Sequence, residues 1–216
     1  MSLVGSPGSG KTTVGRQLAK LLDVPFIELD AIFHQAGWRG LQRKEFRERV
    51  NQALVKESWV VDGNYSVVQD LVWGRADTVV WFDLRRPVIM RRVIKRTLRR
   101  ALTREVLWNG NREPLTNFYR LDPEKNIIRW SWVKHADYAE RYRAAMLEEA
   151  NAHLRIVRLK TPGEVEAMLV HATGQTSAES WPADPPGGAI DVWSTSLAGR
   201  PRCRRAPFAP PAHGQR

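Results

Sequence analysis

The chain has 216 residues, and its 43% of hydrophobic residues excludes a wholly disordered protein because a packed core is within reach. Its length predicts one domain, with at most an appendage. The 34 lysines and arginines against 23 acidic residues give a formal net charge of +11, which favours an anionic partner. A single cysteine, Cys203, excludes an intrachain disulfide framework, and no apolar run reaches the ~20 residues of a membrane-spanning helix. We therefore expect a cytoplasmic protein with no membrane partner.

Short apolar runs alternate along residues 1–171 with longer segments whose apolar residues recur every three or four positions. The short runs predict strands, and the longer segments predict amphipathic helices. This alternation predicts an α/β fold with a five-stranded parallel sheet and helices on both faces. The expected strands lie near 3–4, 24–29, 59–61, 78–82 and 154–159, and the expected helices near 11–22, 43–57, 87–107, 137–150 and 163–171.

The composition changes near residue 172. Residues 172–216 are rich in Ala, Ser, Thr, Gly, Pro and Arg, and seven of the 13 prolines lie among them. Such a segment cannot bury enough apolar surface to offset its ordering entropy. We predict a disordered Pro/Arg-rich tail over 172–216 and a folded domain over 1–171.

A glycine-rich segment follows the first expected strand. Residues 5–12 read GSPGSGKT, which fits the pattern G-x-x-x-x-G-K-[ST] of a P-loop. Its glycines permit positive φ angles, so that backbone N–H groups and the next helix N-terminus can face a phosphate. Lys11 would meet the β and γ phosphates, and the Thr12 hydroxyl would bind Mg²⁺. The motif predicts an ATP and Mg²⁺ site built from Gly5, Ser6, Pro7, Gly8, Ser9, Gly10, Lys11, Thr12 and Thr13.

Acidic residues stand where expected strands end, and ligands of open α/β sheets bind beyond those ends. We prefer Asp62 to Asp83 as the residue that holds a water on Mg²⁺, because a glycine follows it; Asp83 alternatively caps a helix or pairs with nearby arginines. Asp30 either meets the hydroxyl of an acceptor or caps the next turn. Glu28 is expected on the other face of its strand, and His34 on the surface or in packing.

Residues 85–104 hold nine basic side chains and no acidic one. Arg92, Arg96, Arg100 and Arg104 recur every four residues, a spacing at which like charges repel on a helix. A solvated helix face is the alternative, but we expect at least one of these arginines to contact phosphate. Downstream, residues 126–143 mix arginines with aromatic residues, which fits a mobile lid, a nucleic-acid surface or a plain helical hairpin.

The chain resembles the adenylate-kinase-like P-loop proteins, and among them the group called DNA topology modulation proteins. The likeness covers roughly 1–171 and is carried by residues 5–12, IELDA at 27–31, WVVDGNYS at 59–66, ADTVVWFD at 76–83 and LWNGNRE at 107–113. The resemblance implies a P-loop NTPase fold with a helical lid over about 91–143. It also implies that Arg92 and Arg96 hold ATP, that Thr161 lies in the loop beside adenine, and that Asp30 binds an acceptor hydroxyl. Adenylate kinases carry Asp-Gly-Phe-Pro-Arg where this chain has residues 62–65 without that arginine, which speaks against adenylate kinase activity itself.

Three functions remain open on the sequence. The first is an ATP- and Mg²⁺-dependent phosphotransferase, similar to nucleoside and nucleotide kinases, that moves the γ-phosphoryl group to a small acceptor. Its catalytic residues would be Lys11, Arg96, Arg100 and Asp30, with Arg92 and Thr161 binding ATP and Thr12 and Asp62 on the metal side. The second is an ATP-regulated nucleic-acid-binding protein, and the third a nucleotide-binding protein without turnover. The sequence names neither the acceptor nor the oligomeric state.

Overall fold

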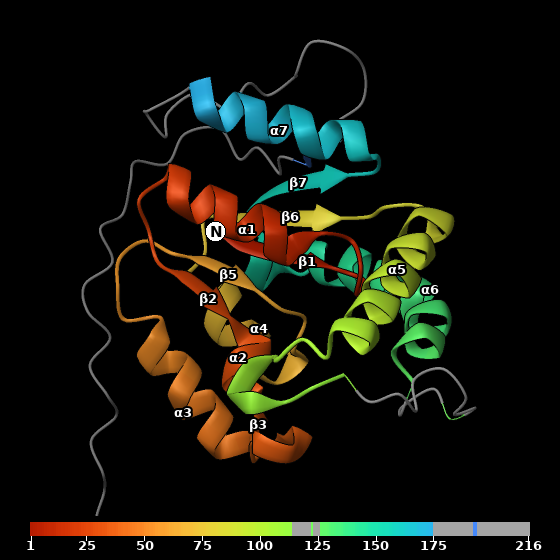
Figure 1. Cartoon of the computed structure of the whole chain (residues 1–216). Coiled ribbons are helices and arrows are strands. Elements are labelled where there is room, and N and C mark those ends of the chain that lie inside the picture. The colour runs from red at the N-terminus through yellow and green to blue at the C-terminus, as the bar shows by residue number, and fades with distance from the viewer. Residues whose placement is uncertain (114–121, 123–125, 175–191, 194–216) are drawn as a thin grey trace, which may run out of the picture.

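The structure is a computed structural model, and it describes residues 1–113, 122, 126–174 and 192–193. Its sheet has the strand order β2-β5-β1-β6-β7-β8. The first five strands run parallel, and β8 pairs antiparallel with β7 at the edge (Figure 1). The predicted five-stranded parallel sheet is therefore confirmed. The strands are β1 Ser2–Gly5, β2 Phe26–Glu28, β5 Val60–Asp62, β6 Thr78–Phe82, β7 Arg155–Leu159 and β8 Val192–Trp193.

Successive residues of the central strands point to opposite faces of the sheet, so each strand contributes side chains to two hydrophobic cores, one on each face. In β1, Leu3 belongs to one apolar cluster and Val4 to the other. In β6, Val79 and Val80 divide in the same way, and all four side chains are buried. Burial on both faces explains why these strands are continuous apolar runs in the sequence.

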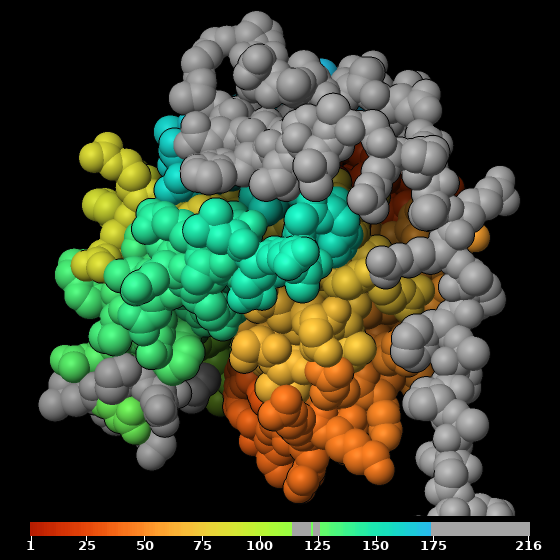
Figure 2. Space-filling view, turned by 180° about the vertical axis from the view of Figure 1, so that it is seen from behind, coloured from red at the N-terminus to blue at the C-terminus, as the bar shows by residue number. Residues whose placement is uncertain are grey.

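Helices of the described residues cover both faces of the sheet. The helices α1 (Lys11–Leu21), α5 (Arg86–Thr103) and α7 (Pro162–Gly174) contribute to the Leu3 core, while α3 (Arg43–Ala53), α4 (Ser66–Trp73) and α6 (Ile127–Met146) contribute to the Val4 core. Seen from behind, α6 and the segment after it lie beside α4 in a continuous surface (Figure 2). The predicted arrangement of helices on both faces is confirmed.

Several elements depart from the sequence-based expectation. The second strand ends at Glu28, and a short helix α2 (Leu29–Phe33) begins at once, so Asp30 lies in a helical turn rather than at a strand end. After it come β3 (His34–Gln35), a 3₁₀ turn over Ala36–Trp38 and β4 (Arg39–Gly40), which pairs antiparallel with β3. The helix expected over 137–150 begins ten residues earlier, at Ile127, because the Asn126 side chain caps it by accepting from Ile128 N and Arg129 N.

Part of the predicted tail has defined structure. The helix α7 runs three residues past the predicted boundary, to Gly174, and β8 adds to the sheet beside Ile156 and Val157. The boundary predicted at residue 172 thus falls inside α7, and the disorder of the tail stays a prediction. The remainder of the tail (175–191 and 194–216) and the middle of the predicted lid (114–121 and 123–125) lie outside the described residues. No helix in the described part of the chain is long and apolar enough to cross a membrane.

Candidate active site

The P-loop connects β1 to α1 at the carboxyl edge of the sheet, as the motif predicted. β1 ends at Gly5 and α1 begins at Lys11. Three loop glycines have positive φ angles: 142° at Gly5, 84° at Gly8 and 100° at Gly10. Only glycine adopts these conformations without strain. These angles allow the loop to turn its backbone N–H groups toward an anion placed at the N-terminus of α1, which is the arrangement that binds phosphate.

Gly5 also has a neighbour that leaves no room for a side chain. A Cβ atom at this position would lie 2.6 Å from the Phe82 carbonyl oxygen, a backbone atom of the next strand. We expect Gly5→Ala to lower the free energy of unfolding by about 2 kcal/mol, measured by urea denaturation. Gly37 has a φ of 72° but nothing within 4 Å of the added Cβ, so Gly37→Ala should cost only about 1 kcal/mol. Equal losses in the two variants would contradict the steric argument.

Lys11 lies at the floor of the loop. Its Nζ donates hydrogen bonds to the Gly5 carbonyl oxygen at 2.7 Å and to the Ser6 carbonyl oxygen at 3.1 Å. Burial lowers the pKa of Lys11, whereas the negative charges of Asp62 and Asp30 act to raise it. Both carboxylates therefore lie within electrostatic reach of the lysine that would contact the phosphates.

Thr12 and Asp62 meet beside Lys11. The Thr12 hydroxyl donates a hydrogen bond to Asp62 Oδ2 at 2.5 Å. Burial raises the pKa of the Asp62 carboxyl, and Lys11 and Thr12 oppose that rise. Asp83, the alternative for this position, instead pairs with Arg158, whose Nε lies 2.8 Å from its Oδ2.

The side chains of Thr12 and Asp62 fit a magnesium ion. The second carboxylate oxygen of Asp62, Oδ1, is buried and has no hydrogen-bond partner among the described residues. A hydroxyl beside a carboxylate supplies the hard oxygen donors that Mg²⁺ prefers. The described part of the chain has no group of three or more His, Cys, Asp or Glu that could hold a metal. The site therefore suits an ion that takes one or two protein ligands and completes its shell with water and substrate phosphates.

The helix α5 lies against the P-loop. Arg92 Nη1 donates to the Ser9 carbonyl oxygen at 2.9 Å. A Cβ atom at Gly8 would lie 2.3 Å from Val93 Cγ2, so the loop and the helix are in direct contact. The glycine at position 8 thus serves close packing as well as the loop's conformation.

Further along α5, Arg96 and Arg100 line a cleft that the P-loop residues also line. Burial lowers the pKa of Arg96, with the charge of Arg100 as the next cause, and its Nε has no hydrogen-bond partner among the described residues. Arg100 lies 3.7 Å from both Glu105 and Glu113. An incompletely paired, buried guanidinium is a strong anion-binding group.

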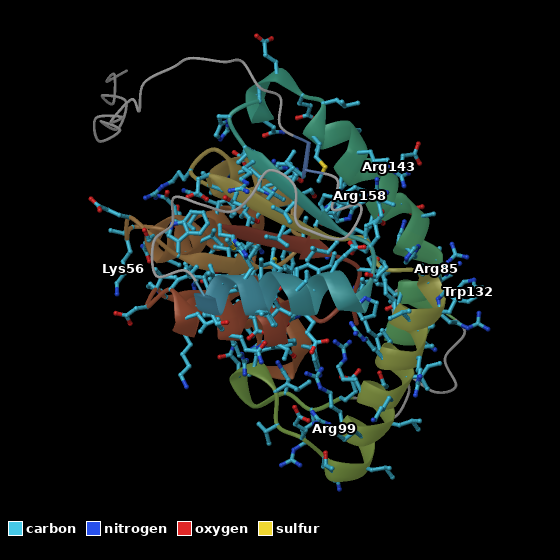
Figure 3. All side chains as sticks on the ribbon, turned by 90° about the horizontal axis from the view of Figure 1, so that it is seen from above. Lys56, Arg85, Arg99, Trp132, Arg143 and Arg158 are labelled. Carbon is cyan, nitrogen blue, oxygen red and sulfur yellow. The ribbon has the colours of Figure 1, made fainter. Side chains whose placement is uncertain are left out.

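The nine basic residues of 85–104 do not act as one cluster. Arg92, Arg96, Arg99 and Arg100 line the cleft, whereas Arg86 stacks on Trp132 with 4.9 Å between guanidinium carbon and ring centre. Arg85 and Trp132 lie at one end of α5 and Arg99 at the other (Figure 3). Only the middle and end of the segment can therefore face one bound nucleotide.

Asp30 lies across the cleft from α5. Its Oδ1 accepts a hydrogen bond from the Tyr65 hydroxyl at 2.6 Å, and that hydroxyl lies 3.4 Å from His34 Nε2. Burial raises the pKa of Tyr65, with Asp30 as the next cause, so the phenol remains a donor. Glu28 also lines the cleft and pairs with Arg16 at 3.0 Å, which corrects its expected place on the other face.

The string at 107–113 closes over this side of the cleft. Asn111 accepts from Trp38 N at 2.9 Å and donates to the Gln35 carbonyl oxygen at 2.9 Å. Asn109 donates to the His34 carbonyl oxygen at 2.6 Å, and Trp108 stacks on the His34 ring with 5.9 Å between centres. This part of the predicted lid, residues 108–111, is thus docked on the 30–40 segment that carries Asp30.

Asn111 is buried, so its two side-chain bonds should hold this docked segment in place. We expect Asn111→Ala to lower the free energy of local opening by about 2 kcal/mol for amides of 105–112, because both bonds are lost. Hydrogen exchange measures this, with the amides of α1 as an internal reference that should not change. An equal loss in both segments would mean that the variant destabilises the whole domain instead.

One cleft of about 1770 Å³ lies between the P-loop, α5 and the segment that carries Asp30. It includes Pro7 to Thr13 and the cleft-facing arginines, together with Asp30 and Asp62. Thr161 is placed differently: its hydroxyl accepts from Glu164 N at 3.2 Å at the start of α7, and its neighbour Pro162 lines the cleft. The predicted contact of Thr161 with adenine stays a prediction.

Sequence reasoning assigned no role to several residues that line the cleft. Tyr65, Trp108 and Arg141 are among them, together with Asn64. Tyr65 and Asn64 follow Asp62 within three positions, so a signal was present in the string itself. Arg141 lies 77 positions from Asn64 in the chain, and only the fold brings the two together.

Comparison with known proteins places the chain in a family. The family model described as "SKI: Shikimate kinase" matches residues 7–121. The shikimate kinase of Synechococcus sp. (strain RCC307) is 35% identical over 105 residues, which are 42% of this chain and 54% of that protein. That of Mycobacterium ulcerans (strain Agy99) is 38% identical over 96 residues, 38% of this chain and 52% of that protein. The chain thus spans about half the length of these curated relatives.

Among solved structures, shikimate kinase from Bacteroides thetaiotaomicron aligns with 80% of this chain and 95% of its own, at 16% identity and a TM-score of 0.46. The family assignment does not rest on this low structural similarity. The matches support neither the DNA topology modulation group nor a nucleic-acid partner. Since the family model covers more than half of its residues, the chain belongs to the shikimate kinase family.

Proposed function

We propose that this protein binds ATP with Mg²⁺ at the P-loop and transfers the γ-phosphoryl group to a hydroxyl of a small molecule. The family and the relatives named shikimate kinase make shikimate the first acceptor to test. The observation that carries the proposal is the meeting of Lys11, Asp62, Arg96 and Asp30 in one cleft.

The charges in the cleft support this reaction. The carboxylate of Asp30 acts to raise the pKa of both Lys11 and Arg96, so it lies within electrostatic reach of both cations. The two cations come from opposite sides, α1 and α5, as is needed to neutralise charge on a phosphoryl group in transfer. An acceptor hydroxyl bound at Asp30 would then lie next to the end of the triphosphate.

Each residue has a defined task in the proposed transfer. Lys11 and Arg96 stabilise the charge that spreads over the γ-phosphoryl oxygens, and Arg92 holds the loop against α5. Asp30 orients the acceptor hydroxyl and takes its proton as the new P–O bond forms. The bond between the γ phosphorus and the β–γ bridging oxygen breaks, and ADP is the leaving group. When bound, Mg²⁺, held at Thr12 and Asp62, supplies further charge neutralisation.

A screen of acceptors tests the proposal. ADP release is followed with MgATP and a panel of shikimate, other polyol acids, sugars, nucleosides and nucleotides, and ³¹P NMR identifies a phosphorylated product. We expect one acceptor class to stimulate ADP release well above the rate with ATP alone, with one phosphorylated product formed for each ADP. MgATP binding without transfer to any member of the panel would favour nucleotide binding without turnover instead.

A further inference from the structure

Asn64 is part of the Asp-Gly-Asn-Tyr string, and the proposed transfer gives it no task. It follows β5, which ends at Asp62, and Gly63, whose φ of 149° turns the chain away from the strand direction. Its carboxamide folds back onto β1: Gly5 N donates to Oδ1 at 3.1 Å, and Nδ2 donates to the Gly5 carbonyl oxygen at 2.5 Å. One side chain thus bonds to both backbone groups of the first P-loop residue.

The position of Gly5 explains why such a partner is needed. The ladder between β1 and β5 pairs Leu3 with Asp62, and β5 has no strand residue left to pair with Gly5. Backbone groups buried without a partner are costly, so the end of the ladder needs a substitute for the missing peptide. A carboxamide both donates and accepts, as a peptide does. Asn64 therefore extends the ladder by one step with its side chain.

The bond between Asn64 and the Gly5 carbonyl bears on ATP binding because Lys11 bonds to the same carbonyl oxygen. The Gly5 carbonyl oxygen that accepts from Asn64 also accepts from Lys11 Nζ at 2.7 Å. The β and γ phosphates would compete with the loop carbonyls for the three N–H donors of Lys11 and can draw the ammonium group away from Gly5. The bond from Asn64 Nδ2 leaves the Gly5 carbonyl with a donor when that happens, so the loop keeps its shape.

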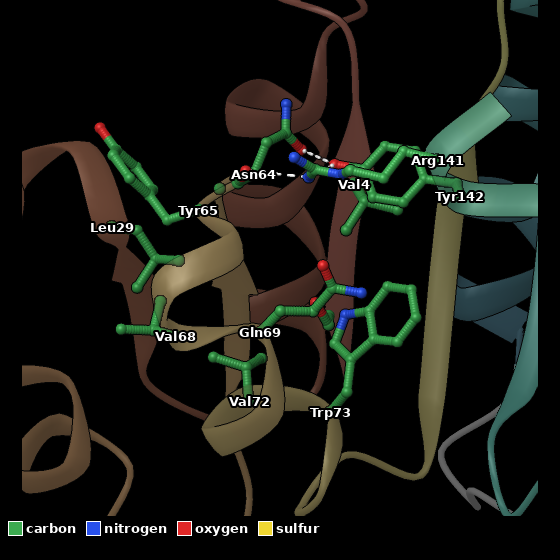
Figure 4. Close-up of a pocket in the computed structure, with 12 residues that line it drawn as sticks. Val4, Leu29, Asn64, Tyr65, Val68, Gln69, Val72, Trp73, Arg141 and Tyr142 are labelled. Carbon is green, nitrogen blue, oxygen red and sulfur yellow. Dashed lines mark hydrogen bonds between the residues drawn. The ribbon is translucent and has the colours of Figure 1, made fainter. Parts of the chain in front are cut away.

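Asn64 also connects the loop to α6, through its side chain and its backbone carbonyl. Tyr142 Oη donates to Asn64 Oδ1 at 2.8 Å, and Arg141 Nη2 donates to the Asn64 carbonyl oxygen at 3.0 Å and to Tyr142 Oη at 3.1 Å (Figure 4). Tyr142 is 1% exposed, so it is a fixed point of the core. The crevice beside these residues has a volume of only about 10 Å³, too small for any ligand larger than a water molecule. The crevice side of this network therefore holds the loop and has no room for a ligand, while Asn64 and Arg141 also line the main cleft.

We propose that Asn64 is a positioning residue of the P-loop. Its carboxamide fixes Gly5 at the end of β1 and accepts from Tyr142, while its backbone carbonyl accepts from Arg141, so the residue joins the loop to α6. The affinity for MgATP then depends on the donor and acceptor of Asn64, which act through Gly5 and not through a contact with the nucleotide. This inference rests on the proposed function only in that ATP is the ligand of the loop.

The test compares Asn64→Asp and Asn64→Ala with Gln69→Glu. Asp keeps the shape of Asn and still accepts from Gly5 N, but it cannot donate to the Gly5 carbonyl oxygen. We expect each Asn64 variant to weaken MgATP binding about tenfold in calorimetry, since at least one hydrogen bond to the loop is lost. Gln69 lies on α4 and lines the same crevice, so Gln69→Glu makes the matched change of charge, and its dissociation constant should stay within twofold of wild type.

Hydrogen exchange at the Gly5 amide gives a second reading that needs no nucleotide. Asn64→Ala removes the acceptor of this N–H and should speed its exchange at least tenfold, whereas Asn64→Asp and Gln69→Glu should not. Folded Asn64 variants that bind MgATP as tightly as wild type would overturn the inference and leave the proposed function standing. If wild type itself binds no MgATP, the proposed function fails, and unchanged Gly5 exchange in Asn64→Ala would overturn the inference separately.

Tyr142→Phe keeps the inference testable if the Asn64 variants do not fold. It removes only the hydroxyl that bonds to Asn64 Oδ1 and retains the buried ring. We expect MgATP binding to weaken about threefold, because Asn64 keeps both bonds to Gly5 but loses one of its supports. Unchanged affinity in this variant would contradict the proposed connection from α6 to the loop.

Discussion

Replacing Lys11 with alanine is expected to lower kcat/KM for phosphoryl transfer about 10³-fold while the domain stays folded. This corresponds to a loss of ~4 kcal/mol of transition-state stabilisation. The reason is the place of the ammonium group, which is buried at the floor of the P-loop and held by the Gly5 and Ser6 carbonyl oxygens. A positive charge at this depth is screened little by water, so its effect on a developing negative charge is large.

Lys20→Ala is the matched control for this experiment. Lys20 lies in the last turn of the same helix and is exposed, so the variant should keep wild-type turnover. Urea denaturation of both variants separates loss of chemistry from loss of fold. Folded Lys11→Ala protein with more than a tenth of the wild-type kcat/KM would contradict the mechanism.

The elements that the sequence predicted well are those whose burial is decided locally. β6 is an apolar run because both faces of the sheet are covered there. The helices α1 and α5 show the three- and four-residue spacing of a helix with one buried side. The segment from α2 to β4 has neither signal. Its short pieces are held by contacts with residues 108–112 more than seventy positions away, which no local pattern contains.

The candidate site was likewise predictable from the sequence only where its residues form a local pattern. The P-loop is continuous in the sequence, so its geometry could be predicted from glycine and lysine spacing alone. The four-residue spacing of the arginines predicted rows on a helix, but it could not tell which row faces the loop; the contact of Arg92 with Ser9 decides this. The bond between Tyr65 and Asp30 joins residues 35 positions apart and was beyond sequence reasoning.

Replacing Asp30 with asparagine is expected to lower kcat about 100-fold and to leave the affinity for MgATP equal to or tighter than that of wild type. Asparagine keeps the shape of the side chain and can still accept from the Tyr65 hydroxyl, so the variant removes little besides the negative charge. The loss of turnover follows because the acceptor hydroxyl loses the group that orients it and takes its proton.

The affinity for MgATP should respond in the opposite direction, because the charge removed acts on Lys11 and Arg96 from across the cleft. Without it, both cations attract the triphosphate at least as strongly as before. Steady-state kinetics and calorimetry measure the two effects separately, and Asp137→Asn, on the exposed side of α6, should change neither. Weaker MgATP binding with unchanged kcat would place Asp30 on the nucleotide side of the cleft. A lower kcat with equal or tighter MgATP binding places it on the acceptor side. There the Tyr65 hydroxyl occupies only Oδ1 of Asp30, which leaves the second carboxylate oxygen for the hydroxyl of the acceptor.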